Sequence, residues 1–290
     1  MGSRGLSTPW PAPAKLNLGL RIVGRRSDGY HRLQTVFQFI ERCDFLGFVP
    51  RTDGRICRQG TIPGVTEDED LTVRAARLLR ERHGPTPGVT IYLDKHLPMG
   101  GGLGGGSSDA ATTLVALNHY WELNLSTREL AELGLSLGAD VPVFVLGHAA
   151  WGENLGDTLT PLVLQESWFL ILIPDAVVST REVFQDSRLT RDSLPVTMRR
   201  FLRSHCSNDC EAVVFKRFPA VVAAARWLSR YASPHLTGTG CCVFAAFARQ
   251  QDALAVASWA PCKAMVAMGK NQSSLQERLR QEKISSATGP

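Results

Sequence analysis

Long apolar runs are missing from this sequence, and with them the signature of a membrane-spanning protein. The longest apolar stretches, such as Trp168 to Ile173 and Cys241 to Phe247, are far too short to cross a bilayer. Residues Met1 to Pro13 contain one arginine and no apolar run after it, so we do not expect a signal peptide. These absences favour a cytoplasmic protein with no membrane partner.

Cysteine pairs with metal-binding spacing are missing as well. The chain has seven cysteines, an odd number, and none belongs to a CxxC pair. Cys206 and Cys210 lie four positions apart and Cys241 and Cys242 are adjacent, and neither spacing is typical of a metal site. We therefore expect free thiols in a reducing compartment.

Clustered charge of one sign is also absent. The 32 lysines and arginines exceed the 27 acidic residues by only five, and the arginines are spread along the chain. This pattern lacks the basic stripe of a nucleic-acid-binding protein, so no nucleic acid partner is expected. A mild positive potential would still attract an anionic substrate. An RNA-binding module remains the alternative from a different functional class.

Strand and helix signals are mixed along the 290 residues, which is typical of an α+β protein with two lobes and a cleft between them. Alternation over Ala14 to Leu20 predicts a half-buried strand, with Lys15 and Asn17 on its polar face. Apolar residues at helical spacing predict helices from Leu71 to Arg82 and from Ser107 to Trp121. Ser107 or Ser108 is the expected N-cap of the second.

The second half is expected to begin near Pro161, which divides the chain into lobes 1–160 and 161–290. Its signals comprise strands at Trp168 to Ile173 and Cys241 to Phe247, and helical stretches near Arg191 to Arg203 and Pro219 to Tyr231. The polar segment from about residue 276 is expected to be frayed or mobile.

The strongest chemical signal is a segment with six glycines in seven positions. Ordering such a backbone costs much conformational entropy, so a merely structural loop would rarely contain so many glycines. Without Cβ atoms, successive N–H groups can turn inward around phosphate oxygens, and the helix that follows points its N-terminus at the same anion. We expect an ATP-binding loop formed by Pro98, Met99, Gly100, Gly101, Gly102, Leu103, Gly104, Gly105, Gly106, Ser107 and Ser108.

Other glycine-rich motifs fit this segment less well. A Walker A loop requires Lys and then Ser or Thr after its last glycine, whereas Ser107 follows Gly106 here. A dinucleotide fingerprint can be read from Gly100 to Gly105, but no acidic residue at the end of a strand follows at the expected distance. A flexible linker is disfavoured because an amphipathic helix begins immediately.

Two charged residues lie in otherwise apolar surroundings. Asp140 is followed by Val141 to Phe144, and a carboxylate in that position is either buried with a partner or functional. Lys15 lies on a strand that otherwise looks like core. Such a pair suits phosphoryl transfer, in which the carboxylate accepts the hydroxyl proton and the ammonium offsets phosphoryl charge.

Two turns complete the set of candidate segments. Asp28-Gly29-Tyr30-His31 joins a turn to an aromatic ring and an imidazole, a pair that is usually structural but could stack on a flat heterocycle. Thr237-Gly238-Thr239-Gly240 precedes an apolar strand and could close the cleft beside the glycine loop.

Taken together, these segments resemble the GHMP kinase superfamily. Its hallmarks are a P-x-A-K-x-N strand, a glycine-rich loop of the type above and a C-terminal G-x-G turn, which here are Pro13 to Asn17, Pro98 to Ser108 and Gly238 to Gly240. The likeness is closer still to the branch that phosphorylates a cytidylylated methylerythritol for isoprenoid precursors. The residues carrying it include Asp28 to Thr35 and Gly138 to Pro142.

The resemblance implies a two-lobed fold, a small-molecule substrate, ATP and Mg²⁺, and a monomer or weak homodimer. By likeness, Asp140 is the general base and Lys15 its partner, and Lys95, Asp70 and Asp109 join the loop around ATP. Asp70 and Asp109 stand where relatives often have Asn, and an ionised Asp can accept but not donate a hydrogen bond. The substrate would contact Asn17, Tyr30, His31, Thr180, Phe184, Gly238, Thr239 and Gly240; no metal ligand is assigned.

Rivals within the superfamily are a mevalonate or homoserine kinase and a phosphorylating decarboxylase. The Tyr30-His31 segment argues against a mevalonate or homoserine kinase, because neither mevalonate nor homoserine contains a flat heterocycle for these rings to bind. The product formed would separate a decarboxylase from a kinase.

Overall fold

The computed structural model describes residues 8–203 and 207–287, and within these ranges it contains ten strands and ten helices. Strands and helices are mixed along the chain in an α+β arrangement, as the sequence predicts. No helix in the described part of the chain is both long and apolar enough to cross a membrane.

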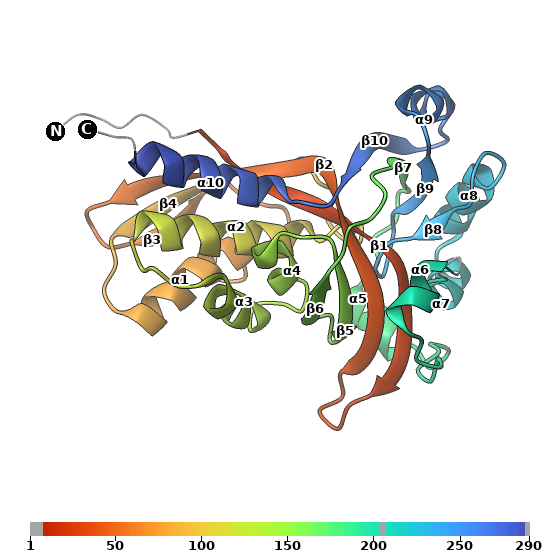
Figure 1. The fold of residues 1–290 in the computed structure, drawn as a ribbon, viewed down its shortest axis with the longest axis horizontal. Coiled ribbons are helices and arrows are strands. Elements are labelled where there is room, and N and C mark those ends of the chain that lie inside the picture. Colours follow the sequence, from red (N-terminus) through yellow and green to blue (C-terminus); the bar gives the residue numbers. More distant parts are fainter. Residues whose placement is uncertain (1–7, 204–206, 288–290) are drawn as a thin grey trace.

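Two long antiparallel strands run through the molecule (Figure 1). They are β1 (Trp10–Arg25) and β2 (His31–Arg51), joined by a turn in which Gly29 has a φ of 88°. The residue pairing shifts between Asn17 and Leu20, so the alternation of side chains is interrupted there. The polar side chains of Lys15 and Asn17 are buried rather than solvent-facing, which corrects the expected half-buried strand.

Strand β2 connects the two halves of one ten-stranded sheet. The order along the sheet is β3-β4-β2-β10-β7-β9-β8, with β1 and β5 also paired to β2, and β6 paired to β5. Only the β3–β4 pairing is parallel among the described strands. The remaining bounds are β3 (Ile56–Gln59), β4 (Gly88–Asp94), β5 (Ala150–Asn154), β6 (Thr158–Pro161), β7 (Trp168–Ile173), β8 (His235–Leu236), β9 (Val243–Phe247) and β10 (Lys263–Lys270).

Helices gather at both ends of this sheet (Figure 1). In the first half they enclose a core around Trp10, Phe39 and Phe144. In the second half a separate core surrounds Leu170 and Phe244. The helices of the first half are α1 (Leu71–His83), α2 (Gly105–Tyr120), α3 (Thr127–Leu135) and α4 (Val141–Leu146); those of the second are α5 (Thr180–Gln185), α6 (Met198–Arg203), α7 (Glu211–Arg217), α8 (Pro219–Leu228) and α9 (Gln250–Ala257).

Most expected elements are present, with two corrections of extent. Helix α2 begins at Gly105, with Gly104 in a left-handed conformation as N-cap, so Ser107 and Ser108 lie inside the helix and not before it. The helical stretch expected from residue 191 begins only at Met198. Pro195 disfavours helix there, and the Gln34 side chain holds the backbone N–H of Val196 at 3.0 Å.

The C-terminal segment forms helix α10 (Ser274–Ala287) instead of an irregular tail from about residue 276. Leu275 is buried at its start, and the Arg278 guanidinium lies over the Trp10 ring at 5.4 Å from its centroid. These contacts give the helix a docking surface on β1 even though it has no strong apolar stripe. The lobes 1–160 and 161–290 remain a prediction, and any such division must account for α10 packing on the first half.

Candidate active site

A cleft of about 1380 Å³ lies between the glycine-rich segment, the β1–β2 hairpin and the start of α5. It is lined by nearly every residue that the sequence marked as functional. Ser108 and Gly240 are the exceptions, since both are buried behind the lining. The structure therefore brings together segments that are as far apart in sequence as Lys15 and Thr239.

The glycine loop adopts a conformation that side chains would disturb. Gly100, Gly102 and Gly104 have φ values of 69°, 76° and 75°. A Cβ on Gly102 would lie 2.1 Å from the carbonyl oxygen of Thr237, and one on Gly104 would lie 2.6 Å from the Phe144 ring. The glycines are therefore needed for close approach to neighbouring segments as well as for exposed N–H groups.

The loop is fastened to the second half of the chain through its backbone. Cys241 N–H donates to Gly100 O at 3.1 Å, and Cys242 N–H donates to Gly101 O at 3.2 Å. Helix α2 begins within the glycine-rich segment, at Gly105, so its free N–H groups and positive dipole end face the cleft. Loop and helix together provide the donors that phosphate groups require.

Lys15 and Asp140 form the ion pair expected of the catalytic residues. The Lys15 ammonium lies 3.2 Å from Asp140 Oδ2, and the Lys15 side chain is 3% exposed against 34% for Asp140. Asp140 precedes α4 but forms no side-chain capping bond, so its carboxylate stays directed to the cleft. The same ammonium donates to Gly102 O at 3.1 Å, which links the pair to the glycine loop.

A hydrogen-bond network fixes Lys15 from behind. Asn17 Oδ1 accepts from the Lys15 ammonium at 2.5 Å, and Asn17 Nδ2 donates to Thr35 Oγ1 at 2.9 Å. Thr237 Oγ1 accepts from Asn17 N–H at 3.0 Å and donates to Gly102 O at 3.1 Å. Asn17 is only 3% exposed and its side chain contacts Lys15 and Thr35, so its contact with the substrate remains a prediction.

A second buried charge cluster lies under the start of α2. The Lys95 ammonium contacts carboxylate oxygens of both Asp44 and Asp109, the latter at 2.7 Å. Asp44 also accepts from the backbone N–H groups of His96 and Leu97 at 2.6 and 2.8 Å. Burial alone would lower the pKa of Lys95, but the two carboxylates outweigh it and raise that pKa.

Asp109 differs from Asp44 in having an unpaired oxygen. Its Oδ1 is buried without a hydrogen-bond partner in the described structure. Burial, together with the nearby charge of Asp44, raises the pKa of Asp109 to about 7 against the opposing effect of Lys95. The carboxyl therefore binds a proton in the folded protein at pH values where the unfolded chain has lost it.

This raised pKa predicts a pH-dependent stability. Between about pH 4 and 7 the folded state binds more protons than the unfolded state. The free energy of unfolding therefore falls as the pH rises, by at most about 1.4 kcal/mol per pH unit from this group. We expect Asp109→Asn to flatten that fall in urea unfolding at pH 5, 6, 7 and 8. Parallel curves for the variant and the wild type would contradict the raised pKa.

Asp70 has a structural function that the sequence analysis did not assign to it, although an aspartate directly before a helix is a typical N-cap. It is the N-cap of α1, where Oδ1 accepts from Thr72 N–H at 2.8 Å, and its other oxygen lies 2.6 Å from Arg58 Nε. The residue is 3% exposed although it reaches the lining of the cleft. One oxygen caps the helix and the other is in ion-pair contact with Arg58 without a hydrogen bond, so the contribution of Asp70 to nucleotide binding remains a prediction.

At the far end of the cleft, aromatic rings gather around the β1–β2 turn. Tyr30 is 64% exposed, and the His31 ring stacks on Phe184 with centroids 5.2 Å apart and planes at 29°. His31 and Phe184 contact each other, so a base cannot lie between these two rings unless they separate. The faces of His31 and Phe184 that point away from each other, and the exposed Tyr30 ring, remain available for a base to stack on.

The Gly238–Gly240 turn is supported by side chains from two neighbouring segments. Thr180 Oγ1 and Thr239 Oγ1 lie 2.8 Å apart across the cleft wall. Asn208 is buried beneath the turn, where its Nδ2 donates to Leu236 O at 2.9 Å and to Gly238 O at 2.7 Å.

Two of the residues that the sequence analysis did not predict are charged and contact predicted site residues. Asp44 lies between Cys43 and Phe45 and is followed by Leu46, and a carboxylate before apolar residues, as at Asp140, could have indicated it. Arg191 contacts His31 and lines the cleft, but nothing in its local sequence distinguishes it from a surface arginine.

The described residues contain no metal cluster and no disulfide. No three His, Cys, Asp or Glu side chains in residues 8–203 and 207–287 are grouped so as to hold a metal ion. Cys43, Cys57, Cys210, Cys241, Cys242 and Cys262 are free thiols, as expected; Cys206 lies outside the described residues.

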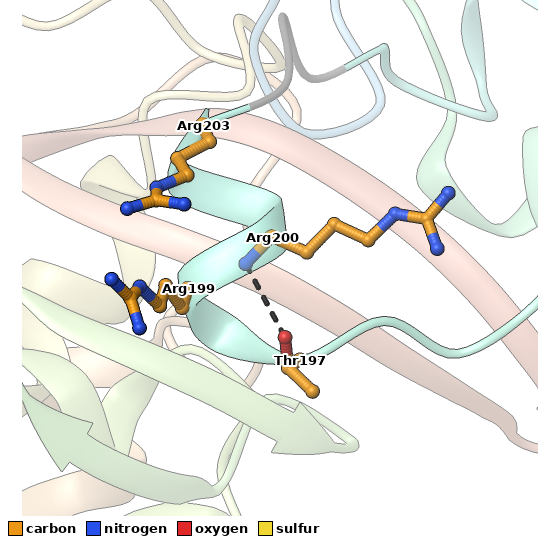
Figure 2. Close-up of a pocket in the computed structure, with 4 residues that line it drawn as sticks. All are labelled: Thr197, Arg199, Arg200 and Arg203. Atoms are coloured by element: carbon orange, nitrogen blue, oxygen red, sulfur yellow. Dashed lines mark hydrogen bonds between the residues drawn. The ribbon is translucent and has the colours of Figure 1, made fainter.

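A smaller hollow of about 400 Å³ lies apart from this cleft, on α6. Figure 2 shows Arg199 and Arg203 directed to one side of the helix and Arg200 to the other. Thr197 Oγ1 accepts from the Arg200 backbone N–H at 3.3 Å. The lining residues that the structure describes are three arginines and a threonine, so this hollow offers cations.

Comparison with known proteins gives consistent matches. Residues 70–148 match the sequence family described as GHMP kinases N terminal domain. A 4-diphosphocytidyl-2-C-methyl-D-erythritol kinase of Nitrosococcus oceani is 54% identical over 272 residues, covering 93% of this chain and 97% of that protein. The enzyme of the same name from Shewanella denitrificans is 49% identical over 277 residues, covering 94% and 98%.

Solved structures agree in fold. A crystal structure of a 4-(cytidine 5'-diphospho)-2C-methyl-D-erythritol kinase superposes with a TM-score of 0.78 at 30% identity, covering 90% of this chain and 99% of that one. A homoserine kinase from Cytophaga hutchinsonii reaches a TM-score of 0.69 at 14% identity, covering 94% and 98%, which supports the shared fold alone.

Proposed function

The chain belongs to the 4-diphosphocytidyl-2-C-methyl-D-erythritol kinases, a family of GHMP kinases in the non-mevalonate isoprenoid pathway, and from this premise we propose how its cleft carries out the reaction. The enzyme transfers a phosphoryl group from ATP to its cytidylylated substrate. The observation that carries the proposal is the Lys15–Asp140 pair, 3.2 Å apart beside the glycine loop.

In the proposed mechanism Asp140 accepts the proton of the 2-hydroxyl group of the substrate. The hydroxyl oxygen then forms a bond to the γ-phosphorus of ATP, the bond from that phosphorus to the β–γ bridging oxygen breaks, and ADP leaves. Lys15 offsets negative charge on the phosphoryl group, while Asn17 and Gly102 O hold its ammonium in place.

ATP is assigned to the glycine-loop side of the cleft. The α2 N-terminus and the loop N–H groups would bind the phosphates, and the lining beside Asp70 and Lys95 would hold the nucleoside. Asp109 Oδ1, buried and without a partner in the described structure, is a suitable acceptor for an exocyclic amino group when the carboxyl is ionised.

Mg²⁺ is proposed to enter with ATP instead of occupying a site made by the protein. Magnesium in such sites is held mainly by phosphate oxygens and water, which fits a described chain without an acidic cluster. Ser107 lines the cleft at the start of α2, and its hydroxyl is our candidate ligand; Ser108 is buried behind it. The metal would neutralise phosphate charge during transfer.

The acceptor is assigned to the opposite end, with its cytosine at Tyr30, His31 and Phe184. Stacking faces and edge hydrogen bonds are what a pocket needs to distinguish cytosine from other flat rings. Thr180, Gly238, Thr239 and Gly240 would position the part of the substrate near the reacting hydroxyl, with Gly240 acting through the turn.

A coupled ADP-release assay tests the assignment. We expect ADP release with 4-diphosphocytidyl-2-C-methyl-D-erythritol and background rates with mevalonate or homoserine, because only the first has a base for the aromatic end. Release with mevalonate or homoserine alone would overturn the substrate assignment. Mass measurement of the product would separate simple phosphorylation from decarboxylation.

The remaining partner predictions concern assembly, nucleic acid and location. A monomer or weak homodimer in the cytoplasm, without nucleic acid, is still what we expect. If the alternative of an RNA-binding module holds, the arginines on α6 are the expected contact surface. Salt-sensitive RNA retention that is lost in an Arg199→Gln, Arg203→Gln double variant would favour that alternative.

A further inference from the structure

Arg191 occupies an unusual position behind the His31 ring. Its Nε–H donates to His31 Nε2 at 3.0 Å. Its two terminal nitrogens donate to three backbone carbonyls, Leu189 O at 3.0 Å, Phe184 O at 2.9 Å and Asp186 O at 2.8 Å. No carboxylate in the described structure forms an ion pair with this guanidinium, so no anion offsets its positive charge beside the imidazole.

This contact fixes the chemical state of His31. A guanidinium has five N–H donors and no acceptor, so Nε2 must provide a lone pair and cannot carry a proton. A neutral imidazole with a free Nε2 carries its proton on Nδ1. Among the described residues no hydrogen bond reaches Nδ1, and the His31 ring lines the cleft.

The charges around His31 favour the neutral form of its imidazole ring. Arg25 lies opposite His31 in the strand pairing, so cations face the ring from both β1 and the segment after α5. Burial, followed by the charges of Arg191 and Arg25, lowers the pKa of His31. The nearby carboxylates of Asp28 and Asp186 are engaged by Arg26 and Arg188, at 2.9 and 2.6 Å.

We propose that Arg191 is a positioning residue for substrate recognition, which holds His31 as a neutral Nδ1–H donor directed to an acceptor atom on the pyrimidine edge of the substrate. Cytosine presents two such acceptors, the ring nitrogen N3 and the carbonyl oxygen O2. Through Phe184 O the same guanidinium also fixes the segment whose ring stacks on His31. The proposal rests on the proposed function for the identity of the ligand, but not for the state of His31.

The first test needs no substrate. In ¹⁵N-resolved NMR spectra of the full chain, with the His31 signals assigned by their loss in His31→Gln, we expect the neutral ring to carry its proton on Nδ1. In Arg191→Met the tautomer should become mixed, and the pKa of His31 should rise because a neighbouring cation has been removed. A wild-type ring protonated on Nε2, or an unchanged ring in Arg191→Met, would overturn the proposal.

The second test is kinetic. We expect Arg191→Met to raise KM for the cytidylylated substrate roughly tenfold at pH 8, and further at pH 6, while kcat and KM for ATP change little. Arg191→Lys keeps a cation with N–H donors and no acceptor, so it should restore the state of His31 and part of the affinity. Equal losses in kcat and in both KM values would indicate a merely structural effect and count against the proposal.

Arg128→Gln serves as the control. Arg128 lies on α3, pairs with Glu132 at 2.9 Å and does not line the cleft, so its replacement should leave both KM values and the His31 spectrum unchanged. If the wild-type protein releases no ADP with the cytidylylated substrate, the proposed function fails, while the spectra still decide whether Arg191 sets the state of His31.

Discussion

Replacing Asp140 with asparagine is expected to lower kcat by about 10²- to 10⁴-fold, the usual contribution of a positioned general base. Asparagine has nearly the same shape but cannot accept the hydroxyl proton. The Lys15 ammonium would keep its contacts with Asn17 Oδ1 and Gly102 O, so the phosphate-binding loop should stay in place. ATP should therefore bind with near-normal affinity while turnover almost disappears.

Single-turnover kinetics and equilibrium ATP titration of the same preparation would measure these two quantities separately. Asp252→Asn is a suitable control, because Asp252 forms an ion pair with Arg249 on α9 and lies outside the cleft. It should retain wild-type turnover. Normal turnover in Asp140→Asn would remove Asp140 as the base, and a combined loss of ATP binding would point to a structural function.

Gly102→Ala is expected to reduce kcat/KM by about 100-fold or more, because displacements near 1 Å at a catalytic site have effects of that size. Gly102 has a φ of 76°, and a Cβ there would lie 2.1 Å from Thr237 O. The loop must move away from the Gly238–Gly240 turn. The Lys15 ammonium and Thr237 Oγ1 then lose the position of their shared acceptor, Gly102 O.

Gly54→Ala distinguishes this clash from the general strain of a left-handed alanine. Gly54 has a φ of 70°, but its Cβ would meet no atom within 4 Å. We expect it to lose about 1–2 kcal/mol of unfolding free energy with unchanged kcat/KM. Urea unfolding and steady-state assays on both variants provide the comparison; similar activity losses in the two would refute the steric argument.

Much of the site could be predicted from short sequence segments, because its chemistry depends on residue types that are rare in their surroundings. Six glycines in seven positions, or a carboxylate before an apolar run, have few purely structural explanations. The spacing of apolar residues likewise predicted strand β7 to the residue and helix α1 to within one residue.

Other features could not be read from the sequence because distant contacts determine them. Ser107 and Ser108 look like helix N-caps, yet α2 starts earlier because Gly104 can adopt a left-handed turn beside Phe144. The polar segment after residue 276 looks mobile, yet it is helical because Leu275 and Arg278 pack near Trp10. In both cases tertiary contacts outweigh local propensity.

For this protein the sequence by itself determined the class of chemistry: a phosphate-binding loop, an acid–base pair and an aromatic end, which together indicate a kinase. The tertiary structure decided which partners these side chains contact and which further residues hold them in place. It buried Asp70 as a helix cap, joined Asp44 to Lys95, and placed Arg191 behind His31. The physical reason is that residue type fixes what a group can do, whereas its protonation, partners and orientation are set by neighbours far away in the chain.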